Sequence, residues 1–298
     1  MTITTNHGGR SPEHRPAGAT AGDSASHSPA AGSPVGASAT GSTAGSTAGG
    51  RIAALARAEI TLLARNRTAV FVALLMPLAM TVALKSSLDR VDLGPTGLSV
   101  AGVALTGGIG AALIQVVHMN LVSTYVARRE ERVLKRLRTG EIRDLEILGA
   151  TALPAALLLL AQSALIVAVG GAVMGLGAPK QPALLVAGLL LGCVLLAGLA
   201  ALTSAGTRTV QTAQLTTLPF FLASGMGSGL FVPLAVLPDR LAACCELLPL
   251  TGVMTLVRAG WLGGESAGAL VGAAVSALVW TGFAVFAGRR WFRWDPRR

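Results

Sequence analysis

Charged residues are scarce in this sequence, and its long apolar stretches contain almost none. Only 13% of the 298 residues are charged, whereas 52% are hydrophobic. Soluble domains carry about 25% charged residues, and a helix needs about 20 apolar residues to cross a hydrocarbon core about 30 Å thick. Several runs in this chain reach that length. The scarcity of charge therefore excludes an ordinary soluble protein and predicts an all-α membrane protein.

Cysteine is also scarce, and the common signatures of metal and nucleotide sites are missing. The three cysteines, Cys193, Cys244 and Cys245, lack the Cys-x-x-Cys spacing of a metal site. The sequence has neither a His-Glu-x-x-His motif nor the Gly-x-x-x-x-Gly-Lys-Ser/Thr loop that holds ATP. We therefore expect no metal, no cofactor and no catalytic activity in this chain. Its net charge of +10 favours basic residues that flank membrane spans over a nucleic-acid partner.

The N-terminal part lacks long apolar runs and divides into two segments. Residues 1–50 consist largely of Gly, Ser, Thr, Ala and Pro. This composition cannot bury enough apolar surface to fold, so we expect a disordered cytoplasmic tail. Residues 51–67 place Ile52, Ile60 and other apolar residues at helical spacing, with arginines on the other side. That pattern is typical of an amphipathic helix in the membrane interface.

Six transmembrane helices account for the apolar runs that follow. The expected spans are 68–86, 98–126, 150–174, 183–204, 210–232 and 267–288. Grouped by segment, the first two lie in 68–127, the next three in 147–232 and the last in 267–288, before a basic cytoplasmic tail, 289–298. The segment 233–266 is broken by three prolines and carries interspersed charge. We expect it to enter the membrane from the extracellular side and return, with its irregular backbone shielded by protein.

The charges that the chain does have are concentrated on one side of the expected membrane. Alternate loops and ends carry 17 basic residues on one side and 5 on the other. The positive-inside rule therefore predicts a cell-membrane protein with both termini in the cytoplasm. The segment between the second and third spans, 128–146, holds 12 charged residues among 19, seven basic and five acidic. We expect this segment to be a cytoplasmic loop that contains a short helix.

This cytoplasmic segment also has a narrow apolar ridge. Val133, Leu134 and Leu137 share one side of a helix, and Glu131 and Lys135 form a supporting pair four residues apart. A short helix of this kind is suited to docking on another protein. Membrane topology and solvation require the basic residues but neither the ridge nor the acids. From spacing alone the two interpretations are equally supported.

Polar residues inside the expected spans are few. Gln115 and His118 lie in the second span, and Gln211, Gln214 and Thr217 lie near the start of the fifth. They either line a substrate pathway or form hydrogen bonds between helices. For His118, a buried and hydrogen-bonded role is favoured over a proton relay or a ligand. The lack of Asp and Glu in the spans argues against a proton-coupled carrier.

Three stretches, in order along the chain, resemble the permease subunits of type 2 ABC transporters. The first is AEITLLARNRTAVFVALLMP, with its interfacial Glu59 and Arg65, and the second is RREERVLKRLRTGE, which carries Lys-Arg-Leu-Arg. The third, ASGMGSGLFVPLAVLPDRLAACCELLPLTGVMTLVRAG, contains Leu-Pro and Leu-Pro-Leu-Thr and ends near Arg258. Arg132 and Gly140 depart from the pattern, since Gly and Pro are common at these places in the family.

The resemblance implies a permease that exports an apolar or amphipathic, drug-like or lipid-like compound, as in multidrug efflux. A separate ABC ATPase subunit would bind ATP and Mg, and a second permease copy would complete a homodimer or heterodimer in the lipid membrane. The residues implied to couple the permease to the ATPase are Glu131, Arg132, Leu134, Lys135, Arg136, Leu137 and Arg138. The alternatives are an ATP-independent secondary carrier, and a membrane anchor or sensor that docks a cytoplasmic signalling protein.

Overall fold

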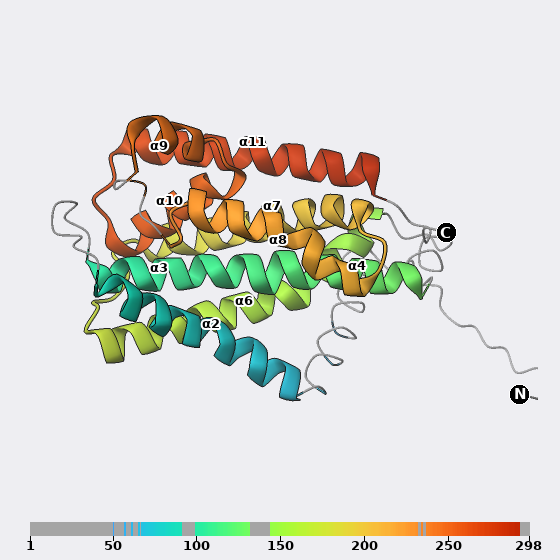
Figure 1. The fold of residues 1–298 in the computed structure, drawn as a ribbon, viewed down its shortest axis with the longest axis horizontal. Helices are drawn as coiled ribbons and strands as arrows, with labels where there is room; N and C mark the ends of the chain where they lie inside the picture. Colours follow the sequence, from blue (N-terminus) through green and yellow to red (C-terminus); the bar gives the residue numbers. More distant parts are fainter. Residues whose placement is uncertain are drawn as a thin grey trace, which may run out of the picture. The chain divides into compact units, whose positions relative to one another are not determined.

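The computed structural model describes residues 50, 57, 61, 65, 67–90, 99–131, 144–231, 234 and 237–292, all within the compact unit Gly45–Arg298. In these residues the regular structure is entirely helical (Figure 1), which confirms the predicted all-α membrane fold. The helices are α2 Arg67–Leu88, α3 Val100–Ala112, η2 Leu113–Met119, α4 Asn120–Glu130, α6 Asp144–Met174, α7 Pro182–Gly206, α8 Val210–Gly227, α9 Asp239–Glu246, α10 Pro249–Leu262 and α11 Ala267–Trp291. The π-helix η2 joins α3 and α4 into one span.

Local sequence signals set several helix boundaries. The side chain of Ser99 accepts a hydrogen bond from the backbone N–H of Gly102 at 3.1 Å and begins α3. Thr209 and Thr212 form a reciprocal capping box at the start of α8. Proline occupies the first turn of α7 and of α10, where a backbone N–H would have no acceptor within the helix. Capping or proline therefore reduces the number of unsatisfied backbone N–H donors at the start of each of these helices.

The span formed by α3, η2 and α4 is the centre of the described helices. Of its most apolar window, 83% is buried, compared with 50% or less in the other candidate spans. It contacts α2, α6, α7, α8 and α10, and it runs through the middle of the view in Figure 1. A Cβ at Gly108 would collide with Thr81 of α2, and one at Gly110 would collide with Met254 of α10. Glycine therefore allows neighbours to approach this span closely on two sides.

The number of crossings differs slightly from the expected six. Among the described residues, five spans are long and apolar enough to cross a membrane: α2, α3–η2–α4, α6, α7 and α11. The fifth expected span corresponds to α8, which is 18 residues long and ends at Gly227 rather than near 232. Its first turns read Val-Gln-Thr-Ala-Gln, so it is less apolar than the others. A sixth apolar crossing arises only if α9 and α10 are counted as one bent span.

The segment expected to re-enter the membrane forms α9 and α10, which meet at a bend of 96°. α9 has no buried residue, whereas 10 of the 14 residues of α10 are buried against α7, α11 and α3. A Cβ at Gly260 would lie 2.5 Å from the backbone nitrogen of Leu185. A Cβ at Gly252 would lie 2.5 Å from the carbonyl oxygen of Ala273. The sharp bend and the buried second helix suit a re-entrant segment, and its glycines let it fit.

Other expected segments lie wholly or partly outside the described residues. These are the tail 1–50, most of the interfacial helix 51–67 and the end of the tail 289–298, for which the expectations stay predictions. The expected loop 128–146 is shorter than predicted at both ends. α4 continues to Glu130 and α6 begins at Asp144, because helical structure extends past the apolar residues into the charged sequence.

We predict that Gly252→Ala destabilises the protein, because the added methyl group would press on the backbone of α11. Overpacking of this kind costs about 1–3 kcal/mol. Gly282→Ala is the matched control: it changes an exposed glycine of α11 whose Cβ would meet nothing within 4 Å. That change should be neutral or stabilising by up to about 1 kcal/mol, since alanine favours helix. Thermal unfolding of the purified variants checks both, and equal melting of the two would contradict the packing described for α10.

Candidate functional site

The residues expected to contact an ATPase belong to the segment between α4 and α6. Of these, Glu131 is exposed and directly follows α4. The others lie outside the described residues, as does Glu59 of the interfacial helix: Arg132, Leu134, Lys135, Arg136, Leu137 and Arg138. Arg65 is helical and exposed. The structure therefore defines the two ends of the expected coupling segment rather than the segment itself.

Among the described residues, neither of the two cavities reported below is lined by any of the five residues expected to line a pathway. Gln115 is half-buried in η2, and His118 is fully buried one turn later. On α8, Thr217 is buried and its hydroxyl donates to the carbonyl of Gln214 at 3.0 Å, whereas the side chains of Gln211 and Gln214 are exposed. Thr217 thus uses its hydroxyl within its own helix. The two glutamines remain available to another molecule.

The structure confirms that His118 is buried and shows what its ring contacts. Its ring is completely buried and lies 4.3 Å, centre to centre, from the ring of Phe220 in α8. The backbone of Leu196 interacts with the ring, but neither ring nitrogen makes a well-formed hydrogen bond within the described part of the chain. The expected burial is present, and the polar contact of the ring within the described residues is limited to the backbone of Leu196. His118 acts in this structure as an aromatic packing residue between η2 and α8.

The strongest polar arrangement lies at the end of α4. Arg129 is 1% exposed, and its guanidinium donates to two backbone carbonyls at the end of α7. Its Nη1 lies 2.9 Å from the carbonyl oxygen of Ser204, and its Nη2 donates to the carbonyl oxygen of Thr207. A helix ends with unpaired carbonyls and a partial negative charge. Arg129 therefore caps α7 with a planar cation that binds two acceptors at once.

Two further side chains tie α4 to α6 in the same region. The Tyr125 hydroxyl donates to the carbonyl oxygen of Leu148 at 3.1 Å, and Arg128 donates to the Thr151 hydroxyl at 2.9 Å. We call Tyr125, Arg128 and Arg129 the α4 clamp. The clamp joins the end of α4 to the start of α6 and the end of α7. These contacts immediately precede and follow the charged segment that links α4 to α6.

Sequence reasoning did not single out the α4 clamp. It counted Arg128 and Arg129 among the solvated charges of segment 128–146. A signal was present, because Arg129 continues a helical face on which Leu121, Val122 and Tyr125 are buried. A charged residue at the next position of a buried face must find a partner there. What sequence could not supply was the identity of that partner, which comes from α7.

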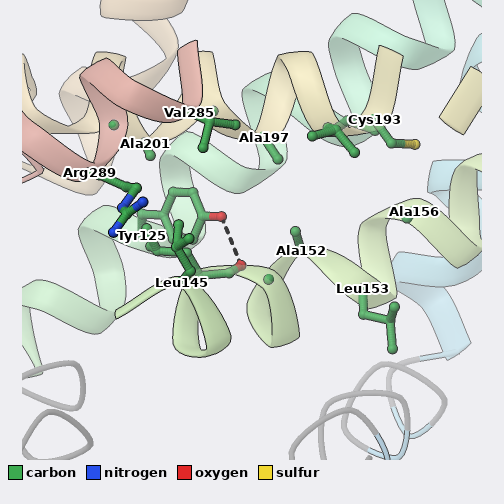
Figure 2. Close-up of a pocket in the computed structure, with 16 residues that line it drawn as sticks. Tyr125, Leu145, Ala152, Leu153, Ala156, Cys193, Ala197, Ala201, Val285 and Arg289 are labelled. Carbon is green, nitrogen blue, oxygen red and sulfur yellow. Dashed lines mark hydrogen bonds between the residues drawn. The ribbon is translucent and has the colours of Figure 1, made fainter. Parts of the chain in front are cut away.

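An apolar cavity of about 280 Å³ lies beside the clamp, and its lining comes from η2, α4, α6, α7 and α11. Figure 2 shows Ala152 and Ala156 of α6 on the side of the cavity opposite Ala197 and Val285. Tyr125 and Arg289 stand together at one end of this apolar cavity (Figure 2). Apart from these two residues, its walls carry only hydrocarbon, glycine and the Cys193 thiol. The apolar cavity is therefore suited to an apolar group with one polar end.

A second cavity, of about 690 Å³, lies near α9, α10 and the first half of α11, at the opposite end of the bundle from α4. Its lining mixes Arg258, Glu246, Glu265 and several hydroxyl groups with apolar residues. The Nη1 of Arg258 lies 3.4 Å from the carbonyl oxygen of Gly229, a long hydrogen bond. This cavity has charges of both signs and is more polar than the apolar cavity. Among the described residues, no cluster of His, Cys, Asp and Glu is arranged to hold a metal ion.

These features define a multi-span helical membrane protein. The family model described as ABC-2 type transporter matches residues 50–262, well over half of the chain. The chain therefore belongs to the ABC-2 type transporter family, and it is a permease, the membrane subunit of an ABC transporter. No curated protein matches the chain. Family membership implies an ABC ATPase partner and, usually, a dimer of permeases in a cell membrane.

We predict that Arg129→Met lowers stability, because two buried carbonyls at the end of α7 lose a charged donor. A hydrogen bond to a charged group contributes about 1.5–3 kcal/mol, so the Tm should fall by about 3–10 °C. Arg129→Lys should recover only part of this loss, since an ammonium lacks the planar fork that reaches both carbonyls. Arg290→Met, at an exposed position of α11, is the control. Thermal unfolding in detergent measures all three, and unchanged melting of Arg129→Met would disprove the capping role.

Proposed function

We propose that this permease exports an apolar or amphipathic compound, driven by a separate ATPase that docks on the segment between α4 and α6. The observation that carries the proposal is the α4 clamp, which anchors the end of α4 to α6 and α7 directly before that segment. Because both ends of the segment are fixed by contacts with the helix bundle, a movement of the ATPase would displace α4 and α6 rather than only deform the segment. ATP and Mg would bind to the ATPase and not to this chain.

The coupling residues themselves follow from the family and the sequence. The ridge Val133, Leu134 and Leu137 would supply the apolar contact with the ATPase, and the surrounding charges would orient it. Individual exposed ion pairs contribute about 0–1 kcal/mol, whereas burial of a leucine contributes about 1.5–3 kcal/mol. The ridge should therefore dominate the docking energy.

The transport pathway is proposed to form between two permease copies. Gln211 and Gln214 are exposed on α8, where hydrocarbon would be an unfavourable neighbour. A facing copy, with a pathway between the two, would supply polar partners or water. The mixture of these amides with Leu215, which is 70% exposed on the same helix, suits an amphipathic substrate. Export as the direction rests on the family resemblance.

The proposed topology places the α4 clamp in the cytoplasmic half of the membrane and α9 outside. The 17-to-5 distribution of basic residues supports this orientation. Arg289 and Arg290, in the last turn of α11, would then face the cytoplasm together with the C-terminus. Arg208, between α7 and α8, would lie on the same side.

We predict that Leu137→Asp abolishes both co-purification of the ATPase and transport, while membrane insertion stays normal. The substitution removes apolar contact area and forces a carboxylate into the contact. Leu247→Asp is the matched control, since it makes the same chemical change at a leucine that is 73% exposed after α9. Arg136→Glu should be partly rescued by a reversed charge on the ATPase. A Leu137→Asp protein that binds its ATPase and transports at the normal rate would show that the segment serves topology alone.

We predict that Asp239→Cys, at the start of α9, reacts with a membrane-impermeant thiol reagent in intact cells. The background carries Cys244→Ser and Cys245→Ser, and retains Cys193, which is buried. Arg290→Cys is the partner variant at the other end and should react only after the cells are permeabilised. Labelling in the reverse order would invert the proposed topology. It would also place the α4 clamp away from any cytoplasmic ATPase.

A further inference from the structure

The apolar cavity exists because α6 and α11 diverge on either side of α7. α11 packs along α7, so closely that a Cβ at Gly198 would lie 3.0 Å from Ala284. α6 packs mainly on α3 and η2 instead. A space therefore remains between α6 and α11, and α7 forms part of its wall. Small residues of α6 and α7, among them Gly149, Ala152 and Ala197, widen it further.

The open side of the apolar cavity is formed by exposed apolar side chains of α6 and α7. Leu145, Leu153 and Val194 line it and are 43%, 36% and 51% exposed. Exposed aliphatic side chains on long apolar helices such as α6 and α7 are suited to contact lipid. The lining offers water almost no hydrogen-bonding partner, and dry apolar cavities take up apolar molecules. A volume of about 280 Å³ is far too small for a helix about 10–12 Å across, but it admits a flexible hydrocarbon chain.

One end of the apolar cavity carries a positive charge. Arg289 lines it and is exposed, and it forms no ion pair within the described part of the chain. Arg290 follows directly in the last turn of α11 but does not line the cavity. Arginine binds phosphate through paired N–H donors. Basic pockets between transmembrane helices bind the head groups of anionic lipids, and each basic residue near the surface contributes about 1 kcal/mol.

We propose that the apolar cavity binds one acyl chain of an anionic phospholipid, whose phosphate is held by Arg289. The lipid comes from the leaflet at the α4 clamp, which is the cytoplasmic leaflet in the proposed topology. The proposal rests on that topology for the choice of leaflet and on nothing else in the proposed function. The bound chain fills the space between α6 and α11.

The proposed lipid lies next to a hydrogen bond of the α4 clamp. Tyr125 and Leu148, which join α4 to α6 by a hydrogen bond of 3.1 Å, both line the apolar cavity. The dashed line from the Tyr125 hydroxyl in Figure 2 marks this bond. A chain in the cavity covers this hydrogen bond from the open side and supports the start of α6. An anionic lipid therefore stabilises the end of the bundle from which the charged segment emerges.

The test measures which lipids the full-length protein retains. The purified protein is reconstituted in vesicles of equimolar phosphatidylcholine and phosphatidylglycerol, extracted in mild detergent and analysed by native mass spectrometry. The wild-type protein should retain phosphatidylglycerol over phosphatidylcholine by about five-fold, the factor expected for one basic residue near a membrane surface. Arg289→Gln should remove the preference but keep a retained lipid. Arg290→Gln should keep the preference.

The second variant fills the cavity. A Cβ at Gly149 would meet nothing within 4 Å, so Gly149→Leu places a side chain in the apolar cavity without a backbone collision. It should abolish retention of both lipids, whereas Gly149→Ala should reduce it less. Gly282→Leu fills equally open space on α11 away from the cavity and should retain lipid as the wild type does.

Three results would overturn the proposal: no lipid retained by the wild type, an unchanged preference in Arg289→Gln, or unchanged retention in Gly149→Leu. If Gly149→Leu stops transport while the wild type retains no lipid, the cavity holds the transported compound and not a membrane lipid. The measurement needs neither ATPase nor transport. Its failure is therefore distinct from a failure of the proposed export function, which the Leu137→Asp variant tests.

Discussion

Polar groups between the two membrane surfaces have no water to bind, so each must find a partner inside the protein or lose several kcal/mol. The described spans meet this requirement mainly within single helices, where threonine hydroxyls donate to the carbonyl four residues earlier. Thr81 does so to Pro77 at 2.8 Å, Thr151 to Ile147 at 2.8 Å and Thr281 to Ala277 at 2.6 Å. These threonine hydroxyls therefore need no partner on another helix. Packing of small residues, rather than polar contact, then decides how the helices meet.

The same constraint explains why the long-range polar contacts gather at helix ends. The last carbonyls of α7 have no helical partner, and Arg129 supplies one from α4. The bend between α9 and α10 frees the carbonyl of Leu247, and the indole of Trp280 donates to it at 3.0 Å. Each contact joins segments that are distant in the chain. Helix ends are therefore the places where this fold ties its elements together, and the α4 clamp is the best developed of them.

The two cavities follow from the way α10 and α6 pack. α10 fits against α7 and α11 through glycines, and leaves a polar cavity around Arg258. α6 turns towards α3 and η2 and leaves an apolar one next to the α4 clamp. In the proposed export cycle, the clamp receives the motion of the ATPase and the lipid-filled cavity supports the helix that moves. A permease of this kind would depend on its membrane as well as on its ATPase.

The sequence by itself determined the fold class, the approximate spans and the family, because length and apolarity decide which segments cross a membrane. It also located the charged segment and the proline-broken stretch before α11. Tertiary structure alone decided that α8 is shorter than its expected span and that α10 is a buried helix. It also decided that His118 packs on Phe220 without well-formed hydrogen bonds and that Arg129 is buried. The physical reason is that a residue's partner on another helix depends on how the helices are rotated and spaced. That geometry comes from small-residue contacts such as Gly252 on Ala273, which no local pattern encodes.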